Sequence, residues 1–564
     1  MVLLMNSDTL LQRNLLALSS KNSNATQAVS QADNNSSVEI RYSKTGHPVP
    51  VIPSGGRSRS LHSLVDPIRE GERIAEAYRK SGYFVVLGLG AGYHILPLLE
   101  SVEISYILII ERDLSLCKKL FFQISYQEIL LNPKINLLID STPEEIKRFI
   151  LSNYYPAVSG NLQTVTLRAR YEMESSYFDD VLSSIKDCIG ELSDDYTVQA
   201  YFGKKWFSNT IANLKTAETS SCTLRPVTKA LVTGAGPSLE DQIPHIKELK
   251  SKSYALIATD TSLPSLIAFD ILPDIVISID CQHITYHHFL AGYPENIPLV
   301  LDLASPPTLT RITDKVFFFT SGHPFSLYVN SHWRQFPYID ISGGNVSHAA
   351  VSLAATLGAR EIFLFGTDFS YPEGKSYSRG TYLYPHFQSH ASRFKPLEYF
   401  FIQFLMRNEN IHRENTGNMI RYTTKPMISY KKRLEDSCTS LSSRIIPVTG
   451  KGVPLDFPQT KSEHARGSLS RLFSAGASST GWYEFLHDYD EGLRNLKIPA
   501  REPFSSYFSN LEPHERDLWI TLLPAAAAIR RENQKRDFDS RMILKRVKEW
   551  SRLIIRHYLR NYNR

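Results

Sequence analysis

The residues best suited to chemistry form a glycine-rich turn in the middle of the chain. Gly234-Ala235-Gly236-Pro237-Ser238 lies between a predicted strand at 230–233 and a predicted helix that runs to about residue 250. Free backbone N–H groups and the positive end of a helix dipole favour a phosphate at such a turn. We therefore expect Gly234, Gly236, Pro237 and Ser238 to bind a nucleotide, the alternative being a tight turn without a ligand.

Acidic residues follow three later strands of the same block. Asp260 ends the predicted strand at 254–259, Asp280 ends the one at 275–279, and Asp368 follows the one at 361–366. In open α/β sheets ligands bind outside the carboxyl ends of the strands. We expect the three acids to converge on one crevice, where a divalent ion could join them. Capping of their own loops is the alternative role.

A second turn with the same features lies further along the chain. Ser342-Gly343-Gly344-Asn345 follows a predicted strand at 338–342 and opens a helix of small residues over 346–357, which indicates a second anion site. Two such turns in one sheet suit a nucleotide with a charged group at each end, such as a nucleotide phosphate and the carboxylate of an acidic sugar.

An earlier glycine turn indicates a different ligand. Gly88-Leu89-Gly90-Ala91-Gly92 directly follows a buried strand predicted at 83–87, and Glu111 ends the next strand. This arrangement can seat an adenosine cofactor, whose ribose the carboxylate would bind. Binding of S-adenosylmethionine by a methyltransferase-like domain is one hypothesis, and a degenerate Rossmann domain that keeps its glycines for packing is the other.

The elements that carry these turns predict an α/β protein. Strands alternate with helices in two blocks, which is typical of parallel sheets. We predict an N-terminal Rossmann-like domain, a central doubly wound α/β domain and a C-terminal helical domain. The boundaries are a flexible lead-in at 1–45, the N-terminal domain with a helical linker at 46–222, the central domain at 223–434 and the helical domain at 435–564.

Composition excludes several classes of protein. The 564 residues include 63 basic and 57 acidic side chains, a formal charge of +6, which does not resemble a nucleic-acid-binding field. The five cysteines are odd in number and contain no Cys-x-x-Cys, which fits a reducing cytoplasm. We find neither a secretory signal nor an apolar stretch of bilayer length, and so expect a cytoplasmic protein without a membrane span.

The motifs resemble those of the motility-associated-factor glycosyltransferases, which decorate flagellin with nonulosonic acids and share their central domain with the archaeal 6-hydroxymethylpterin pyrophosphokinases. The resemblance rests on six segments: Leu61 to Glu72, Gly88 to His94, Gly234 to Leu239, Pro273 to Gln282, Ser342 to Ser347 and Phe365 to Phe369. It covers roughly residues 40 to 430.

The resemblance implies a sialyltransferase-like central domain, a CMP-activated sugar donor and flagellin as the protein acceptor. Residues implied to contact the donor are Gly234, Gly236, Pro237, Ser238, Asp260, Ser342, Gly343, Gly344, Asn345 and Ser347. The chain departs from the family where a histidine is expected after the Gly-x-Asp strand end, since Lys375-Ser376-Tyr377 stands there. We therefore rank the candidates for the general base as Asp368, then His386, then His323.

Two other functions remain open from the sequence. A pyrophosphokinase would use ATP and Mg²⁺ and would need the same acids as metal ligands, although the chain has no Walker Gly-Lys-Ser/Thr motif. A non-catalytic nucleotide-binding scaffold of flagellar assembly is the other alternative.

Overall fold

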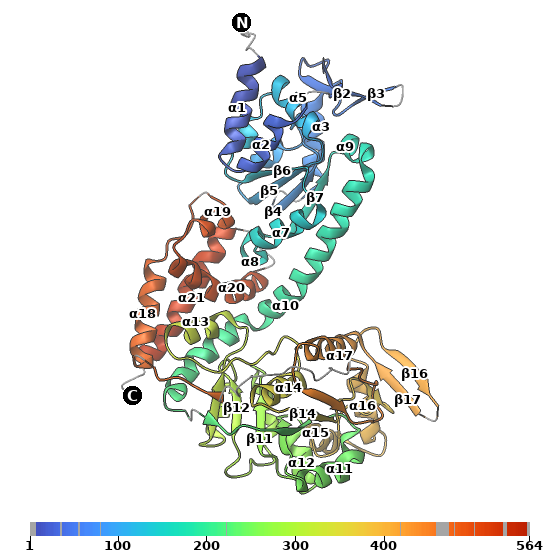
Figure 1. Cartoon of the computed structure of the whole chain (residues 1–564), viewed down its shortest axis with the longest axis vertical. Coiled ribbons are helices and arrows are strands. Elements are labelled where there is room, and N and C mark those ends of the chain that lie inside the picture. Colours follow the sequence, from blue (N-terminus) through green and yellow to red (C-terminus); the bar gives the residue numbers. More distant parts are fainter. Residues whose placement is uncertain are drawn as a thin grey trace. The chain divides into compact units, whose positions relative to one another are not determined.

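The computed structural model describes residues 7–33, 36–54, 57–78, 81–220, 223–417, 419–457, 473–478, 480–500, 502–533 and 539–560. The chain divides into two compact units (Figure 1). The first comprises residues 1–203 and 493–551, and the second comprises 204–492 and 552–564. Each unit is built on a parallel sheet, as the alternation of strands and helices predicts.

The sheet of the first unit has four parallel strands in the order β6-β5-β4-β7. Their bounds are β4 Gly82–Leu87, β5 Ile104–Glu111, β6 Ile135–Ile139 and β7 Leu162–Thr166. Every residue of β4 is buried, as expected for a strand that is covered on both faces. One face packs against α1, α2 and α5 Leu114–Gln123, and the other packs against α7 Pro143–Asn153 and the start of α10 Ser175–Thr219.

The segment predicted to be a flexible lead-in is instead folded. It contains α1 Ser7–Ser19 and α2 Ser23–Gln31, which pack on α5. Asn14 anchors α1, because its amide donates to the carbonyls of Phe121 (2.9 Å) and Ile124 (2.7 Å) and its oxygen accepts from the N–H of Tyr126. Small apolar residues at helical spacing are enough to bury one face of α2, so the polar composition of this segment was misleading.

Shorter elements surround the first sheet. An antiparallel sheet of three strands contains β1 Glu39–Tyr42, β2 Pro48–Ser54 and β3 Arg57–Ser60. Helix α3 Pro67–Glu76 begins after Asp66, whose carboxylate caps it. The other elements are α4 Leu96–Leu99, α6 Gln127–Leu130, α8 Pro156–Ser159 and α9 Arg168–Met173.

The sheet of the second unit has seven parallel strands in the order β13-β12-β11-β10-β9-β14-β18. Their bounds are β9 Lys229–Thr233, β10 Ala255–Thr259, β11 Ile275–Ser278, β12 Leu299–Asp302, β13 Val316–Phe319, β14 Glu361–Phe365 and β18 Arg444–Pro447. The chain runs outward from β9 to β13 and then continues on the other side of β9 with β14. This confirms the doubly wound prediction and puts the switch point between β9 and β14.

Two details of the second sheet differ from the prediction. The strand predicted at 338–342 is wrong: a single bridge between Tyr338 and Thr320 forms there, because the segment turns at once into Ser342-Gly343-Gly344. Strand β18 extends the sheet beyond residue 434, where the helical domain was predicted to begin. The other predicted domain boundaries remain predictions.

Helices and short strands complete the second unit. They are β8 Thr223–Leu224, α11 Leu239–Ser251, α12 Leu263–Ala268, the 3-10 helices η1 His283–Phe289 and η2 Pro307–Arg311, α13 Pro324–His332, α14 Val346–Thr356, β15 Tyr371–Pro372, α15 Leu383–His390, α16 Leu397–Leu405, β16 His412–Thr416, β17 Met419–Thr423, α17 Lys425–Cys438 and β19 Phe473–Ser474. Among them α14 packs directly on β9, β10 and β11.

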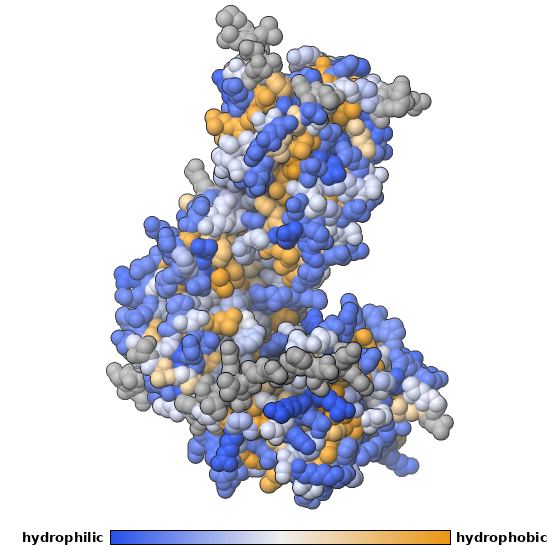
Figure 2. Space-filling view, in the orientation of Figure 1, coloured by the Kyte–Doolittle hydropathy of each residue, from blue (hydrophilic) through white to orange (hydrophobic). Residues whose placement is uncertain are grey.

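The C-terminal part of the chain is helical, as predicted, with α18 Trp482–Asn495, α19 Phe504–Ser509, α20 Pro513–Glu532 and α21 Ser540–Arg560. The apolar residues Ile543 and Val547 of α21 are buried. Hydrophilic residues cover most of the surface visible in Figure 2. Within the described residues, no helix combines the length and the apolar character that a bilayer span requires.

Candidate functional site

The central glycine turn is bonded to the loop that follows β14. Gly234 N–H donates to the Phe365 carbonyl at 2.8 Å, and Gly236 N–H donates to the Gly366 carbonyl at 2.8 Å. Ser238 N–H donates to Asp368 Oδ2, also at 2.8 Å. Three N–H groups that the sequence assigns to a phosphate are therefore used to join the turn to its neighbour across the switch point.

Asp368 fixes this junction from a buried position, with 5% of its surface exposed. Its carboxylate accepts bonds from the N–H and hydroxyl of Ser238 and from the N–H of Gly452. Burial raises the pKa of Asp368, and these bonds only partly offset that rise. The contacts favour a positioning role for Asp368 over that of a base facing an acceptor.

A segment after β18 covers the same turn. Lys451 N–H donates to the Ser238 hydroxyl oxygen at 2.7 Å, and Val453 N–H donates to the Asp368 carbonyl at 2.9 Å. We call residues 449–453 the strap. Beneath it Ser238 and Asp368 are both buried.

The start of α14, which follows the second turn, lies against the first turn. A Cβ atom added to Gly234 would lie 3.1 Å from the hydroxyl oxygen of Ser347, the second residue of α14. Asn345 caps α14 by accepting the N–H of His348 at 3.0 Å. The structure thus brings Gly234 and Ser347 together.

The second turn contacts two groups that the sequence did not single out. Gly343 N–H donates to His348 Nδ1 at 3.1 Å, and His348 Nε2 lies 3.6 Å from Asp340 Oδ2. Ser342 N–H donates to the same aspartate at 2.9 Å. His348 is buried, and this burial lowers its pKa while Asp340 raises it in part. His348 follows the capping residue Asn345 by three residues, and this spacing is the sequence signal that could have revealed the contact.

Asp260 and Asp280 lie at the carboxyl ends of adjacent strands. The Asp260 carboxylate accepts the Ser278 hydroxyl at 2.6 Å and the N–H of Thr261 at 2.6 Å. Asp280 accepts the N–H of Gln282 at 2.9 Å. Burial raises the pKa of Asp280, and the nearby charge of Asp260 raises it further. Asp280 thus accepts fewer hydrogen bonds than Asp260.

Aromatic and histidine side chains lie beside these acids. Burial raises the pKa of Tyr377, and the nearby Tyr371, Tyr382 and Asp260 raise it further. The rings of His288 and Tyr382 lie 5.0 Å apart, edge to face, and His288 is close enough to Asp280 to lower its pKa in part. Sequence reasoning missed His288 and noted Tyr377 only where a family histidine was expected.

The two candidate histidines have unlike surroundings. His386 is exposed on α15, where its ring contacts Phe387 and His390. His323 precedes α13, and its ring stacks on Trp206 at 4.1 Å. Burial raises the pKa of Asp302, at the end of β12, and the nearby His323 lowers it in part. His323 therefore stacks on an aromatic ring and lies near a buried acid.

No three-acid metal site is assembled at these strand ends. In the part of the chain that the structure describes, no group of three or more His, Cys, Asp or Glu is arranged to hold a metal ion. The sharing of one ion by Asp260, Asp280 and Asp368 is therefore not supported.

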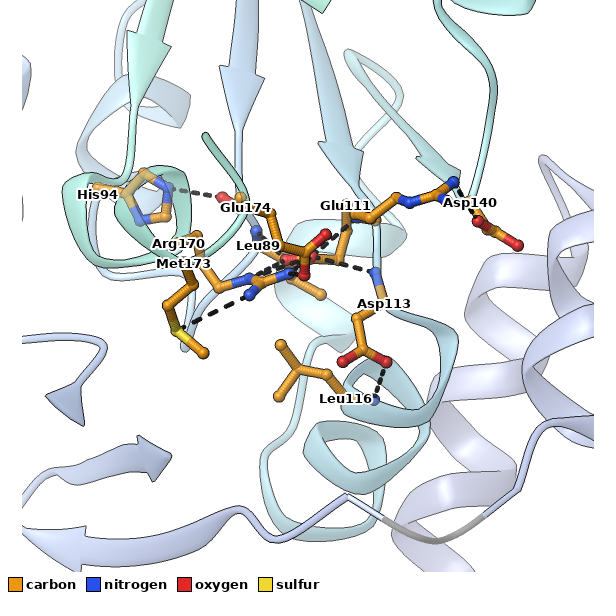
Figure 3. Close-up of polar contacts among 11 residues, drawn as sticks. Leu89, His94, Glu111, Asp113, Leu116, Asp140, Arg170, Met173 and Glu174 are labelled. Atoms are coloured by element: carbon orange, nitrogen blue, oxygen red, sulfur yellow. Dashed lines mark hydrogen bonds and ion pairs between the residues drawn. The ribbon is translucent and has the colours of Figure 1, made fainter. Parts of the chain in front are cut away.

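The N-terminal glycine turn has an acid that is already neutralised (Figure 3). Glu111 accepts the N–H of Leu89 at 3.0 Å and pairs with Arg170, whose Nη2 lies 2.5 Å from Oε1. Both side chains are buried, at 0% and 1% exposure. Burial alone raises the pKa of Glu111, but Arg170 and the N–H donors outweigh it and hold the pKa below its ordinary value. This carboxylate is not available to a ribose.

Side chains occupy the space beside the glycines of the same turn. A Cβ atom on Gly90 would lie 2.5 Å from His62 Nε2, and one on Gly88 would lie 2.8 Å from Arg170 Cβ. A Cβ on Gly92 would overlap Ile129. These contacts favour the interpretation that the glycines serve packing, against a cofactor seated on the turn.

Two family models match this chain. One, described as the glycosyltransferase Maf N-terminal domain, matches residues 10–188. The other, described as 6-hydroxymethylpterin diphosphokinase MptE-like, matches residues 208–374.

Two relatives are uncharacterized proteins of Treponema pallidum (strain Nichols). The first is 34% identical over 152 residues, which are 26% of this chain and 54% of the relative. The second is 28% identical over 167 residues, 29% of this chain and 79% of the relative. The match thus spans about half the length of the first relative.

A solved structure, that of the Maf glycosyltransferase from Magnetospirillum magneticum AMB-1, resembles the whole chain. The TM-score is 0.52 at 16% identity, and the match covers 99% of this chain and 95% of the other. At this identity the likeness shows a shared fold.

Proposed function

We propose that this chain, which belongs to the family of Maf glycosyltransferases, transfers a nonulosonic acid from a CMP-linked donor to a serine or threonine hydroxyl of flagellin. The observation that carries the proposal is the meeting of Gly234 with Ser347 at the carboxyl end of the second sheet. Asp260, Asp280 and the tyrosines 377 and 382 lie beside these strand ends. A nucleotide with an acidic sugar needs such a mixture of polar and aromatic groups.

In this proposal the donor phosphate binds at the second turn and the start of α14. The N–H groups of Gly234, Gly236 and Ser238 already have acceptors, so these residues act by allowing two loops to approach closely. Ser347 and the N-terminus of α14 supply the hydroxyl and the helix dipole that favour a phosphate. Tyr377 and Tyr382 offer rings for the donor.

The proposed reaction is a single displacement. The acceptor hydroxyl oxygen forms a bond to the anomeric carbon of the sugar, while the bond from that carbon to the phosphate oxygen breaks. CMP leaves with the electron pair, and the hydroxyl proton passes to a base. We assign the base to His323, because Trp206 stacks on its ring and the buried Asp302 is close enough to stabilise its protonated form.

The test is transfer in vitro. Purified chain, flagellin and a CMP-nonulosonate should give flagellin heavier by one sugar in intact mass spectrometry. His323→Ala should slow transfer by about 100-fold or more, while CMP still raises the melting temperature; His386→Ala is the matched control and should keep its activity. Asp280→Asn should lose activity, and the exposed Asp314→Asn should not. Absence of any mass increase would overturn the proposal.

The match to an MptE-like diphosphokinase model over 208–374 supports a second candidate function. Such an enzyme would move a diphosphate from ATP to a hydroxymethyl group. Thermal stabilisation separates the candidates: CMP should stabilise a transferase, and ATP with Mg²⁺ should stabilise a diphosphokinase. A lack of response to both would favour the non-catalytic scaffold.

A further inference from the structure

A cavity of about 680 Å³ lies in the first unit, outside the glycine turn. Strand β3, the loop before α3, α3 itself and the start of α9 line it. Its volume is within the range of about 300–1,000 Å³ that small-molecule sites occupy. The cavity is thus large enough for a ligand of nucleotide size.

The position of the cavity matches where a parallel sheet binds ligands. The chain proceeds from β4 to β5 and β6 on one side and returns with β7 on the other side of β4, so the switch point lies between β4 and β7. Residues Thr166, Leu167 and Arg168, at the end of β7 and just after it, line the cavity. His62, which also lines it, covers Gly90 of the turn after β4 and accepts the N–H of Ala91 at 3.0 Å.

Charge around the cavity favours an anion. Its lining contains three arginines, Arg59, Arg73 and Arg168, and two glutamates, Glu70 and Glu172. Glu172 is shared, because it lies 3.2 Å from Arg59 and 2.7 Å from Arg168. The other glutamate accepts the N–H of Ser63 at 2.9 Å, lies 3.3 Å from His62 Nδ1 and also interacts with the charge of Arg73. Guanidinium groups therefore outnumber the carboxylates available to them.

The remaining lining is apolar. Leu61 and Leu167 are buried, and Ile74, Ala77, Tyr78 and Ala169 complete this part of the wall. A bare inorganic ion would leave these side chains uncovered. An organic anion would use both halves of the lining, with its charged group at the arginines and its body on the apolar wall.

We propose that this cavity binds a small organic anion of nucleotide size, whose phosphate or carboxylate is held by Arg59, Arg73 and Arg168. The ligand lies beside His62 and does not enter the glycine turn, because His62, Arg170 and Ile129 fill that turn. The site is independent of the proposed transferase site, since all its residues belong to the first unit.

Hydrogen–deuterium exchange on the full chain tests the proposal and locates the ligand. The probes are AMP, CMP, N-acetylneuraminic acid and inorganic phosphate, each at about 1 mM or more, which detects dissociation constants up to the millimolar range. We expect at least one organic anion to slow exchange in peptides covering 57–78 and 166–173. S-adenosylmethionine, which carries a positive sulfonium, should not.

Matched variants decide whether the cavity is responsible. Arg73→Ala should weaken the protection at least about fivefold in apparent affinity, the loss of roughly one charge-assisted bond, and Arg168→Ala should do the same. Arg69→Ala, on the same helix but outside the lining, should leave the protection unchanged. Protection by none of the organic anions, equal protection by phosphate alone, or protection that survives Arg73→Ala and Arg168→Ala would each overturn the proposal. Loss of transferase activity has no bearing on it.

Discussion

The turns after β4 and β9 are alike in sequence but differ in how the nearby acid is satisfied. After β4, Glu111 forms a buried ion pair with Arg170. After β9, Asp368 accepts bonds from the backbone and hydroxyl of Ser238 and from the backbone of Gly452, and its pKa is raised. One acid is thus held by an adjacent opposite charge, and the other mainly by polar groups, with a smaller contribution from the charge of Lys451.

The difference indicates separate roles for the two turns. A buried ion pair is costly to break, because the remaining charge has no partner, so the N-terminal turn is fixed and its glycines serve packing. The central turn is joined to the β14 loop and to the strap by bonds that can be exchanged for bonds to a ligand or water. The packing role of the N-terminal turn therefore does not exclude ligand binding at the central turn.

The largest expected effect is on the ion pair of the first turn. Arg170→Met should destabilise the first unit by about 3–5 kcal/mol, since it leaves Glu111 buried without its partner. Urea unfolding measures the change. The exposed Arg148→Ala, on α7, is the control and should have little effect.

The double variant Arg170→Met with Glu111→Leu sharpens this prediction. Replacing both charges by apolar groups of similar volume should recover much of the lost stability. A double variant that is as unstable as Arg170→Met would show that packing of the arginine, and not its charge, holds the turn.

A smaller effect is expected at the central turn. A Cβ on Gly236 would lie 2.7 Å from the Gly366 carbonyl oxygen and would overlap the Asp368 carboxylate, so Gly236→Ala should cost about 1–3 kcal/mol through strain. Gly322→Ala is the matched control, because nothing lies within 4 Å of its added Cβ. Equal melting temperatures for both variants would contradict this arrangement of the two loops.

Much of the fold was predictable, because buried parallel strands are apolar runs between helices. Most strands of both sheets up to β14 appear in the sequence as such runs, whereas β7 and β18, which have half-buried residues at the edges of their sheets, were missed. The folding of α1 and α2 was also missed, since their contacts with α5 join residues more than 100 positions apart. Local composition carries no information on such contacts.

The site was only partly predictable. Glycine spacing correctly indicated strand-to-helix turns, whereas the contact of Gly234 with Ser347 was not predicted. The sequence could not show that the N–H groups of the central turn donate to the β14 loop, or that the strap covers Ser238, because β18 and the strap come from more than 200 residues later. Arg170 was missed for the same reason, since its distance from Glu111 in the chain is 59 residues.

The strap contact should contribute less than the packing of Gly236. Ser238→Ala removes the hydroxyl that accepts the Lys451 N–H and donates to Asp368, so we expect a loss of about 1 kcal/mol. Ser251→Ala, at the exposed end of the same helix, should cost almost nothing. Faster hydrogen exchange in peptides of the strap in Ser238→Ala alone would support the contact, and unchanged exchange would contradict it.

The smallest and most direct comparison is in the pH dependence of the two acids. The pKa of Glu111 lies below its ordinary value of 4.5, so its contribution to stability is full above that pH and is lost as the pH falls through the folded-state pKa. The pKa of Asp368 lies above its ordinary value of 3.8, so the folded state binds the proton more tightly, and stability falls as the pH rises from 3.8 through the folded-state pKa. Unfolding free energies of the parent, Glu111→Gln and Asp368→Asn between about pH 4 and 6 measure both slopes. The difference between parent and Glu111→Gln should grow with rising pH, and that between parent and Asp368→Asn should shrink. If both stability differences changed with pH in the same direction, the two acids would have similar surroundings. That result would contradict the difference between the ion pair of Glu111 with Arg170 and the hydrogen bonds of Asp368.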